Sequence, residues 1–299
     1  MSEYHVSVLL NESIENLINR SDGNYVDVTF GAGGHSRLIL NRLSAKGHLY
    51  SFDQDADAVI NVIDDTRFKL IESNFRYVRR FLRLEGISDV DGILADLGVS
   101  SHQLDRPERG FSYRFDAPLD MRMNKESDLS AANILQTYDE DRLVQVFSDY
   151  GEVRNAKTLS KAVLQARKLS PIKSTFDFNR ILEKQVIGPR MKYFSQVYQS
   201  LRIEVNDEIG ALKEMLTEGY RILKPGGRFV VITFHSIEDR VVKNYFKTGN
   251  FEGVVKKDNF GNISRLFTLI NKNVILAGQN EQKNNIRSRS AKLRVAEKI

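Results

Sequence analysis

The sequence contains no cysteine and only five histidines, and these absences exclude several kinds of chemistry. Without cysteine the chain cannot form disulfides or thiolate metal sites, and it offers no thiol nucleophile. It therefore cannot attack C6 of a pyrimidine through a thiol, which is the usual route to methylation at C5. The histidines are scattered and never have the H-x-x-x-H spacing of a zinc-binding helix, so we predict no metal site.

Long apolar runs are absent as well. No stretch of 18 residues is apolar enough to predict a transmembrane helix, and Met1 to Leu10 has neither the basic start nor the apolar run of a secretion signal. We therefore predict a cytoplasmic protein without membrane contact. The 299 residues, 41% hydrophobic and 28% charged, are enough for one large α/β domain with an insertion, or for two domains. The net charge of +5 permits a nucleic-acid partner.

Residues 25–30 predict a short buried strand, a glycine turn follows, and residues 35–43 predict a helix; together they begin a βαβ unit. Such a turn brings backbone close to a ligand, and the free N–H groups of the helix start favour an electron-rich group. The turn contains Gly31, Gly33 and Gly34. A dinucleotide fingerprint would need glycine or alanine where Ser36 stands. The Gly-x-Gly-Gly loop, preceded by Asp27, therefore favours S-adenosylmethionine (SAM), with an ordinary glycine turn as the alternative.

Carboxylates also mark the ends of two further predicted strands. Asp53 follows a strand at 48–52, where it can accept both hydroxyls of a ribose, although it could instead precede and cap a helix at 55–63. Asp96 ends a continuous apolar strand from Val90. After a strand at 68–72, Phe75 is placed where an adenine could lie against its ring. Because ligands of parallel sheets bind beyond the carboxyl ends of the strands, these side chains predict a cofactor site.

From Arg106 to Val205 the alternation of strands and helices stops, and we expect an inserted helical domain for substrate recognition. The predicted organisation is the first part of a SAM-binding domain at 1–105, the insertion at 106–205 and the second part of the SAM-binding domain at 206–299. The predicted helices of the insertion are 131–136, 140–150, 156–168 and 176–185. The last part predicts helices at 206–223 and 237–247, and strands at 228–234, 266–270 and 293–295. The expected fold is α/β, with a Rossmann-like sheet.

Two stretches of the chain are strongly basic, and the first suggests contact with phosphate. Arg76, Arg79, Arg80 and Arg83 share one face of a predicted helix and have no acidic neighbour before Glu85. The common alternative is a solvated helix face. A second basic stretch lies between Arg154 and Lys173, within the insertion.

Several runs of residues closely resemble the bacterial MraW family, the small-subunit ribosomal RNA methyltransferases H. They are Thr29–Ser36, Asp96–Ser101, Pro107–Ser112, Pro118–Met123, Leu201–Glu208, Phe234–Arg240 and Arg287–Arg294. The resemblance implies a class I SAM-dependent methyltransferase that methylates the exocyclic N4 of one cytidine in the decoding region of 16S rRNA, within the small ribosomal subunit. It assigns SAM contacts to Gly33, Gly34, His35, Asp53, Phe75, Asp96 and Gln103. The chain departs from the family pattern at Ser7, at Lys192–Tyr193 and at Ile286.

We expect Asp96 to be catalytic, because an acceptor for the N4 hydrogens favours the tetrahedral nitrogen that forms on attack. Backbone carbonyls around Leu97–Gly98 could share this role. The target base must leave its stack, and Phe111, Tyr113 or Phe115 could receive it, although core packing is the commoner role of an aromatic ring. The alternatives are methylation of another RNA amino group, a ribosome assembly factor without chemistry and a nicotinamide dehydrogenase; the glycine spacing disfavours the dehydrogenase.

Overall fold

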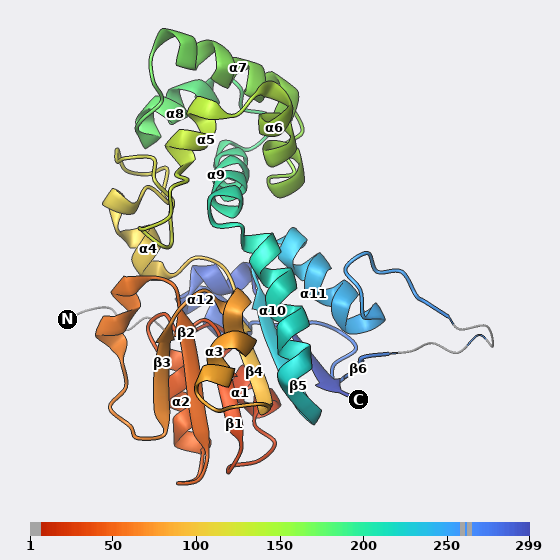
Figure 1. Cartoon of the computed structure of the whole chain (residues 1–299). Coiled ribbons are helices and arrows are strands. Elements are labelled where there is room, and N and C mark those ends of the chain that lie inside the picture. Colours follow the sequence, from red (N-terminus) through yellow and green to blue (C-terminus); the bar gives the residue numbers. More distant parts are fainter. Residues whose placement is uncertain (1–6, 258–260, 262–264) are drawn as a thin grey trace. The chain divides into compact units, whose positions relative to one another are not determined.

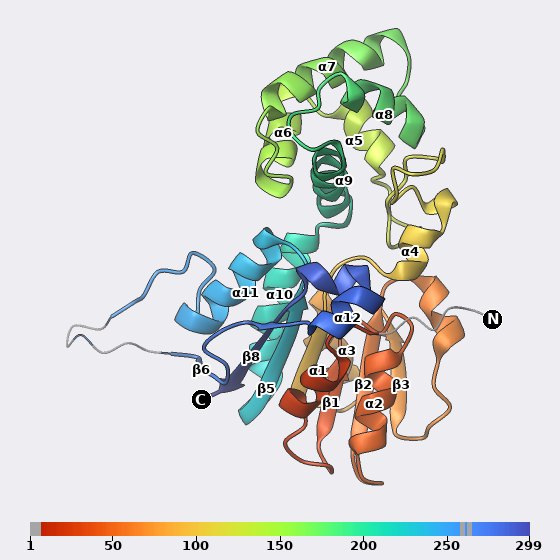
Figure 2. The same ribbon diagram turned by 180° about the vertical axis from the view of Figure 1, so that it is seen from behind.

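The computed structural model describes residues 7–257, 261 and 265–299, which form two compact units (Figures 1 and 2). The first unit comprises Met1–Gly98 and Gly210–Ile299, and the second comprises Val99–Ile209. The insertion boundaries expected from the sequence, 106 and 205, both fall inside the second unit. No helix of the described residues combines the length and hydrophobicity needed to cross a bilayer.

The first unit is built on an eight-stranded sheet with the order β3-β2-β1-β4-β5-β8-β6, in which β7 also pairs with β8. Strands β1 to β5 are parallel, and β8 runs antiparallel to β5. The expected Rossmann-like sheet is therefore confirmed. The strands are β1 (Asn24–Asp27), β2 (His48–Asp53), β3 (Phe68–Glu72), β4 (Val90–Asp96), β5 (Leu223–Thr233), β6 (Phe267–Leu269), β7 (Ile275–Leu276) and β8 (Lys292–Lys298).

The central strands are buried on both faces, which explains why they are continuous apolar runs. In β4 every residue except Asp96 is buried, and its bounds are those predicted. Strand β1 is shorter than predicted, since it ends at Asp27 where the chain turns into the glycine loop. Val28 N still donates to Leu94 O, and Phe30 N donates to Phe52 O, so the start of the loop remains tied to both neighbouring strands.

Helices cover both faces of this sheet (Figures 1 and 2). On one face, α1 (Leu10–Leu17) and α2 (Gly34–Arg42) pack onto a core that includes Leu94 and Val230. On the other face, α10 (Glu208–Ile222) and α11 (Ser236–Thr248) adjoin Phe229, whose ring lies 5.8 Å from that of Phe246. The remaining elements are α3 (Val78–Leu84), α12 (Gln279–Asn284), η1 (Ala56–Asn61), η2 (Phe75–Tyr77) and η5 (Ile286–Ser290). The helix predicted at 55–63 is the 3₁₀-helix η1.

The second unit is helical and has its own core. Its elements are α4 (Ser101–Asp105), η3 (Pro107–Arg109), α5 (Ala131–Thr137), α6 (Glu140–Gln145), the π-helical turn η4 (Val146–Tyr150), α7 (Ala156–Leu169), α8 (Thr175–Glu183) and α9 (Arg190–Asn206). Helix α9 was not predicted, although it supplies much of this core, including Phe194, Val197 and Leu201. A helix that is buried around much of its circumference lacks a single apolar stripe, so its period is hard to recognise.

Candidate active site

Three carboxylates lie at the same edge of the parallel sheet, because β1, β2 and β4 all end in aspartate. Asp27, Asp53 and Asp96 are the last residues of these strands. Strand β1 is parallel to β2 and β4 and pairs with both, so the three carboxyl ends are adjacent. The clustering of carboxylates expected from the sequence is therefore present, but the three side chains have different surroundings.

The glycine loop connects β1 to the start of α2. Gly31 and Gly33 have φ values of 52° and 76°, a left-handed conformation that is strained for residues with a Cβ. Gly33 is the N-cap of α2, and no described side chain caps this helix. The N–H groups of its first turn, which begins with Gly34 and His35, are therefore suited to an anionic ligand group.

Asp27 stabilises the glycine loop through hydrogen bonds. Its side chain is buried, with Oδ2 accepting a 2.6 Å hydrogen bond from Ser36 Oγ and Oδ1 accepting one from Thr29 N. Ser36 Oγ also lies 2.9 Å from Ser51 Oγ of β2. The serine that excludes a dinucleotide fingerprint therefore joins α2 to β1 and β2. Sequence reasoning did not find this structural role, because the contacts join three separate elements.

Asp53 lies beside the loop with both carboxylate oxygens oriented by backbone N–H groups. Gly31 N donates to Oδ2 at 2.8 Å, and Asp55 N donates to Oδ1 at 2.9 Å. Burial raises the pKa of Asp53 to about 6, and the two N–H groups oppose this shift. A carboxylate has about four lone-pair sites, so capacity for two ribose hydroxyls remains.

Phe75 begins η2, directly after β3. Its ring is partly exposed and is not among the buried core residues. The preceding Asn74 donates a 2.7 Å hydrogen bond from Nδ2 to Gln54 Oε1, which ties the segments that follow β3 and β2. Asn74 also accepts from Arg76 N and so caps η2. These contacts fix the backbone next to the ring that the sequence assigns to adenine.

Asp96 has one buried carboxylate oxygen that accepts no hydrogen bond from the described residues. This oxygen is Oδ1, while Oδ2 lies 3.7 Å from His35 Nδ1. Burial raises the pKa of Asp96 well above its usual value, and the charges of Asp27 and Glu238 raise it further. Its backbone N–H donates to Thr29 Oγ1 at 2.7 Å, so Thr29 positions this strand end.

His35 is held in a defined protonation pattern. The side chain is buried, and Nε2 lies 3.1 Å from Val8 O. Because a carbonyl oxygen only accepts, Nε2 must carry a hydrogen. In the neutral ring the lone pair is therefore on Nδ1, the nitrogen nearest Asp96.

Six of the site residues implied by the resemblance belong to the first unit, namely Gly33, Gly34, His35, Asp53, Phe75 and Asp96.

Gln103, the remaining site residue implied by the resemblance, belongs to the second unit. It is buried, and it forms a capping box with Ser100 at the start of α4. Ser100 N donates to Gln103 Oε1 at 3.1 Å, and Gln103 N donates to Ser100 Oγ at 3.2 Å. Its amide oxygen therefore orders the chain just after the first unit ends.

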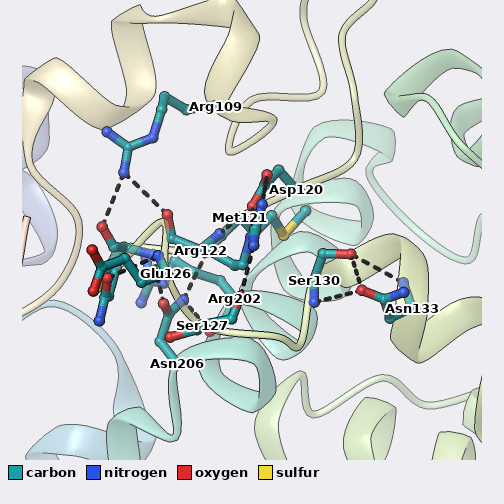
Figure 3. Close-up of polar contacts among 12 residues, drawn as sticks. Arg109, Asp120, Met121, Arg122, Glu126, Ser127, Ser130, Asn133, Arg202 and Asn206 are labelled. Atoms are coloured by element: carbon teal, nitrogen blue, oxygen red, sulfur yellow. Dashed lines mark hydrogen bonds and ion pairs between the residues drawn. The ribbon is translucent and has the colours of Figure 1, made fainter.

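A polar network orders the long loop between η3 and α5 of the second unit (Figure 3). Arg109 is buried and donates from Nη2 to the carbonyl oxygens of Arg122 and Met123. Arg122 forms a two-pronged pair with Asp120, with both N–O distances 2.8 Å. From α9, Asn206 donates to Met121 O and accepts from Met123 N.

The three aromatic candidates for receiving a base differ in exposure. Phe111 is buried in the core of the second unit. Tyr113 packs edge-on against Phe194 and Tyr198, with centroid distances of 5.6 and 5.5 Å. Phe115 is 45% exposed, so of the three it is the ring most available to a ligand.

Two of the four arginines of the predicted basic face are paired with carboxylates. Arg76 Nη2 donates to Glu214 Oε1 at 3.2 Å, and Arg79 Nη1 donates to Glu218 Oε2 at 3.1 Å. Both carboxylates come from α10, 138 and 139 residues further along the chain. Their charges are therefore already compensated by a partner that local sequence could not reveal.

The sheet order, its antiparallel β8, the glycine loop after β1 and the carboxylates that end β2 and β4 define the fold of class I SAM-dependent methyltransferases. The model of the MraW methylase family matches residues 2–299, and the chain belongs to this family. The chain is 54% identical over 297 residues to "Ribosomal RNA small subunit methyltransferase H" of Phocaeicola vulgatus, covering 99% of this chain and 97% of the relative. The protein of the same name from Flavobacterium johnsoniae is 53% identical over 298 residues, covering 99% and 98%. The predicted family is thus confirmed.

Proposed function

We propose that this protein uses SAM to methylate the exocyclic N4 of a cytidine in the decoding region of 16S rRNA, within the small ribosomal subunit. The names of its relatives support a small-subunit rRNA substrate. The observation that carries the choice of an amino group is the buried Oδ1 of Asp96 at the end of β4, which has no hydrogen-bond partner in the part of the chain that the structure describes. An rRNA substrate also supports the cytoplasmic location expected from the sequence.

The residues beside the glycine loop fit the parts of SAM. The first turn of α2, with Gly33, Gly34 and His35, would hold the carboxylate of its amino-acid part. Asp53 would accept the ribose hydroxyls, and the partly exposed ring of Phe75 would contact the adenine. Gln103 joins this set through the family resemblance. When bound, SAM supplies an electrophilic methyl group on a sulfonium.

Asp96 would act on the attacking nitrogen. The N4 lone pair of cytosine is conjugated into the ring, and a hydrogen bond from the amino group to Oδ1 favours the tetrahedral geometry that attack requires. As the N–C bond forms, N4 must lose one proton. The raised pKa of Asp96 makes its carboxylate a better proton acceptor than an ordinary aspartate. The absence of cysteine is consistent with this direct attack by nitrogen.

His35 would assist as a positioning residue. Its Nε2–H is committed to Val8 O, so Nδ1 is the nitrogen that faces Asp96 Oδ2. The 3.7 Å separation is an ion-pair distance and is too long for a hydrogen bond. Orienting Oδ2 toward His35 leaves Oδ1 for the substrate.

The test is methylation of small ribosomal subunits that lack the modification, with isotope-labelled SAM and mass spectrometry of the digested nucleosides. We expect N4-methylcytidine as the product. Asp96→Asn preserves the shape of the side chain but removes its charge, and should lower turnover at saturating SAM by about 10²–10³-fold. Formation of 5-methylcytidine, methylation of a different base, or full turnover by the variant would refute the proposed chemistry.

A further inference from the structure

Helix α7 of the second unit carries a row of exposed lysines. Lys157, Lys161 and Lys168 are all exposed, whereas Leu159 and Val163 are buried in the core of the unit. At 3.6 residues per turn, the three lysines fall within a sector of about 40° and extend over about 16 Å of the helix. The sequence indicated a basic stretch here, and the structure identifies which of its side chains share one exposed face.

These lysine charges are not compensated by neighbouring carboxylates. From Val153 to Ile203 the chain has eleven basic and only two acidic residues. The two acids, Asp177 and Glu183, form ion pairs with arginines 180 and 190. Within the described part of the chain, no carboxylate lies within ion-pair distance of the three lysines. This arrangement contrasts with Arg76 and Arg79, which are paired with carboxylates of α10.

Apolar side chains are exposed where α7 ends and α8 begins. Leu169, the last residue of α7, is 90% exposed, and Phe176 near the start of α8 is 44% exposed. The exposed Lys173 lies between them in the chain. Helices α7 and α8 lie side by side within this unit (Figures 1 and 2). Exposed aromatic and basic side chains on two adjoining helices are the combination with which proteins bind unpaired nucleotides.

We propose that the α7 basic surface, defined as Lys157, Lys161, Lys168, Lys173, Leu169 and Phe176, binds RNA. The lysines contact phosphates, and the ring of Phe176 stacks on an unpaired base. The inference rests on the proposed function for the identity of the partner, since an rRNA substrate supplies both phosphates and unpaired bases. The excess of positive charge favours RNA over a protein partner as the occupant.

The first test removes three charges from the full-length protein. Lys157→Gln, Lys161→Gln and Lys168→Gln are combined, and binding to a 16S rRNA transcript is measured between 50 and 300 mM KCl. Losing three phosphate contacts should reduce the slope of log K against log salt by about two units, and should weaken binding about tenfold or more at 100 mM. The matched control combines Arg42→Gln, Lys46→Gln and Lys243→Gln, which removes three exposed charges from the first unit.

The second test is Phe176→Ala, which should weaken binding by about 5- to 150-fold while leaving the salt slope unchanged. SAM affinity should be unchanged in all these variants. A lysine triple variant whose slope and affinity equal those of its control would overturn the proposal and show that these lysines form an ordinary solvated helix face. If the wild-type protein binds RNA but does not methylate small subunits, the proposed function fails, and the comparison of the two triple variants still decides this inference.

Discussion

Replacing Asp53 with asparagine separates the contribution of this residue to the fold from its contribution to SAM binding. In the free protein both oxygens already accept backbone N–H groups, from Gly31 and Asp55. Asparagine provides one acceptor oxygen and no charge, so one of these N–H groups loses its partner. That loss should cost about 1 kcal/mol of folding stability. We therefore expect Asp53→Asn to fold.

The effect on stability depends on pH. The folded protein raises the pKa of Asp53 from its ordinary value near 4 to about 6. A raised pKa stabilises the fold below about pH 4, and this stabilisation is lost as pH rises through 6; it is on the order of 3 kcal/mol. Asp53→Asn lacks this dependence. Relative to wild type, the variant should therefore be more stable at pH 8 than at pH 4.

At high pH the substitution should lower SAM affinity, the opposite sign to its effect on stability. Two hydrogen bonds from ribose hydroxyls to a carboxylate contribute about 1.5–3 kcal/mol each, and asparagine can retain one weaker bond. The expected loss is about 2–4 kcal/mol, or about 30- to 900-fold in SAM affinity at pH 8. In the wild type, SAM affinity should rise with pH around a midpoint near 6, because only the ionised carboxylate accepts both hydroxyls fully.

Calorimetric titration with SAM at pH 5, 6, 7 and 8, together with thermal unfolding at each pH, measures all three effects. Asp65→Asn is the control, because Asp65 lies far from the loop in sequence and Arg67 lowers its pKa to about 2. It should bind SAM normally, without an inflection near pH 6. Equal SAM affinity of Asp53→Asn and wild type at pH 8 would show that the ribose is held elsewhere, and a flat wild-type profile would refute the pH argument.

Two further substitutions test the site and the loop of the second unit. His35→Gln can still donate to Val8 O but lacks an acceptor at the place of Nδ1, so its turnover at saturating SAM should fall about 10- to 100-fold. His35→Asn restores an acceptor at that place, so its turnover should fall less. If His35→Asn lost more turnover than His35→Gln, the proposed positioning role would be excluded. Gly110→Ala should destabilise the protein by about 2–5 kcal/mol, since a Cβ there would lie 2.3 Å from Pro118 O at a φ of +70°. Gly86 has a φ of +78° but open space around it, so Gly86→Ala should cost only about 1–2 kcal/mol of folding stability. Equal melting temperatures of the two variants would contradict this reasoning.

Local sequence was sufficient where the fold imposes a local pattern. The ranges 68–72 and 90–96 were predicted as strands and are β3 and β4, because strands buried on both faces must be continuous apolar runs. The glycine loop was recognisable for a similar reason, since left-handed backbone at Gly31 and Gly33 favours glycine. The long motif runs then identified the family, which residue spacing alone did not.

Only the tertiary structure shows that side chains which look alike in the sequence have different partners and therefore different roles. Asp27, Asp53 and Asp96 each end a strand, yet Asp27 accepts hydrogen bonds from Ser36 and Thr29, whereas the buried Oδ1 of Asp96 has no partner among the described residues. The arginines of one predicted face also differ in their partners, because Glu214 and Glu218 of the distant helix α10 pair with Arg76 and Arg79. Helix α9 went unpredicted because it is buried on several sides. Hydrogen bonds, ion pairs and burial depend on which distant segments the fold brings together, and only the tertiary structure supplies those partners.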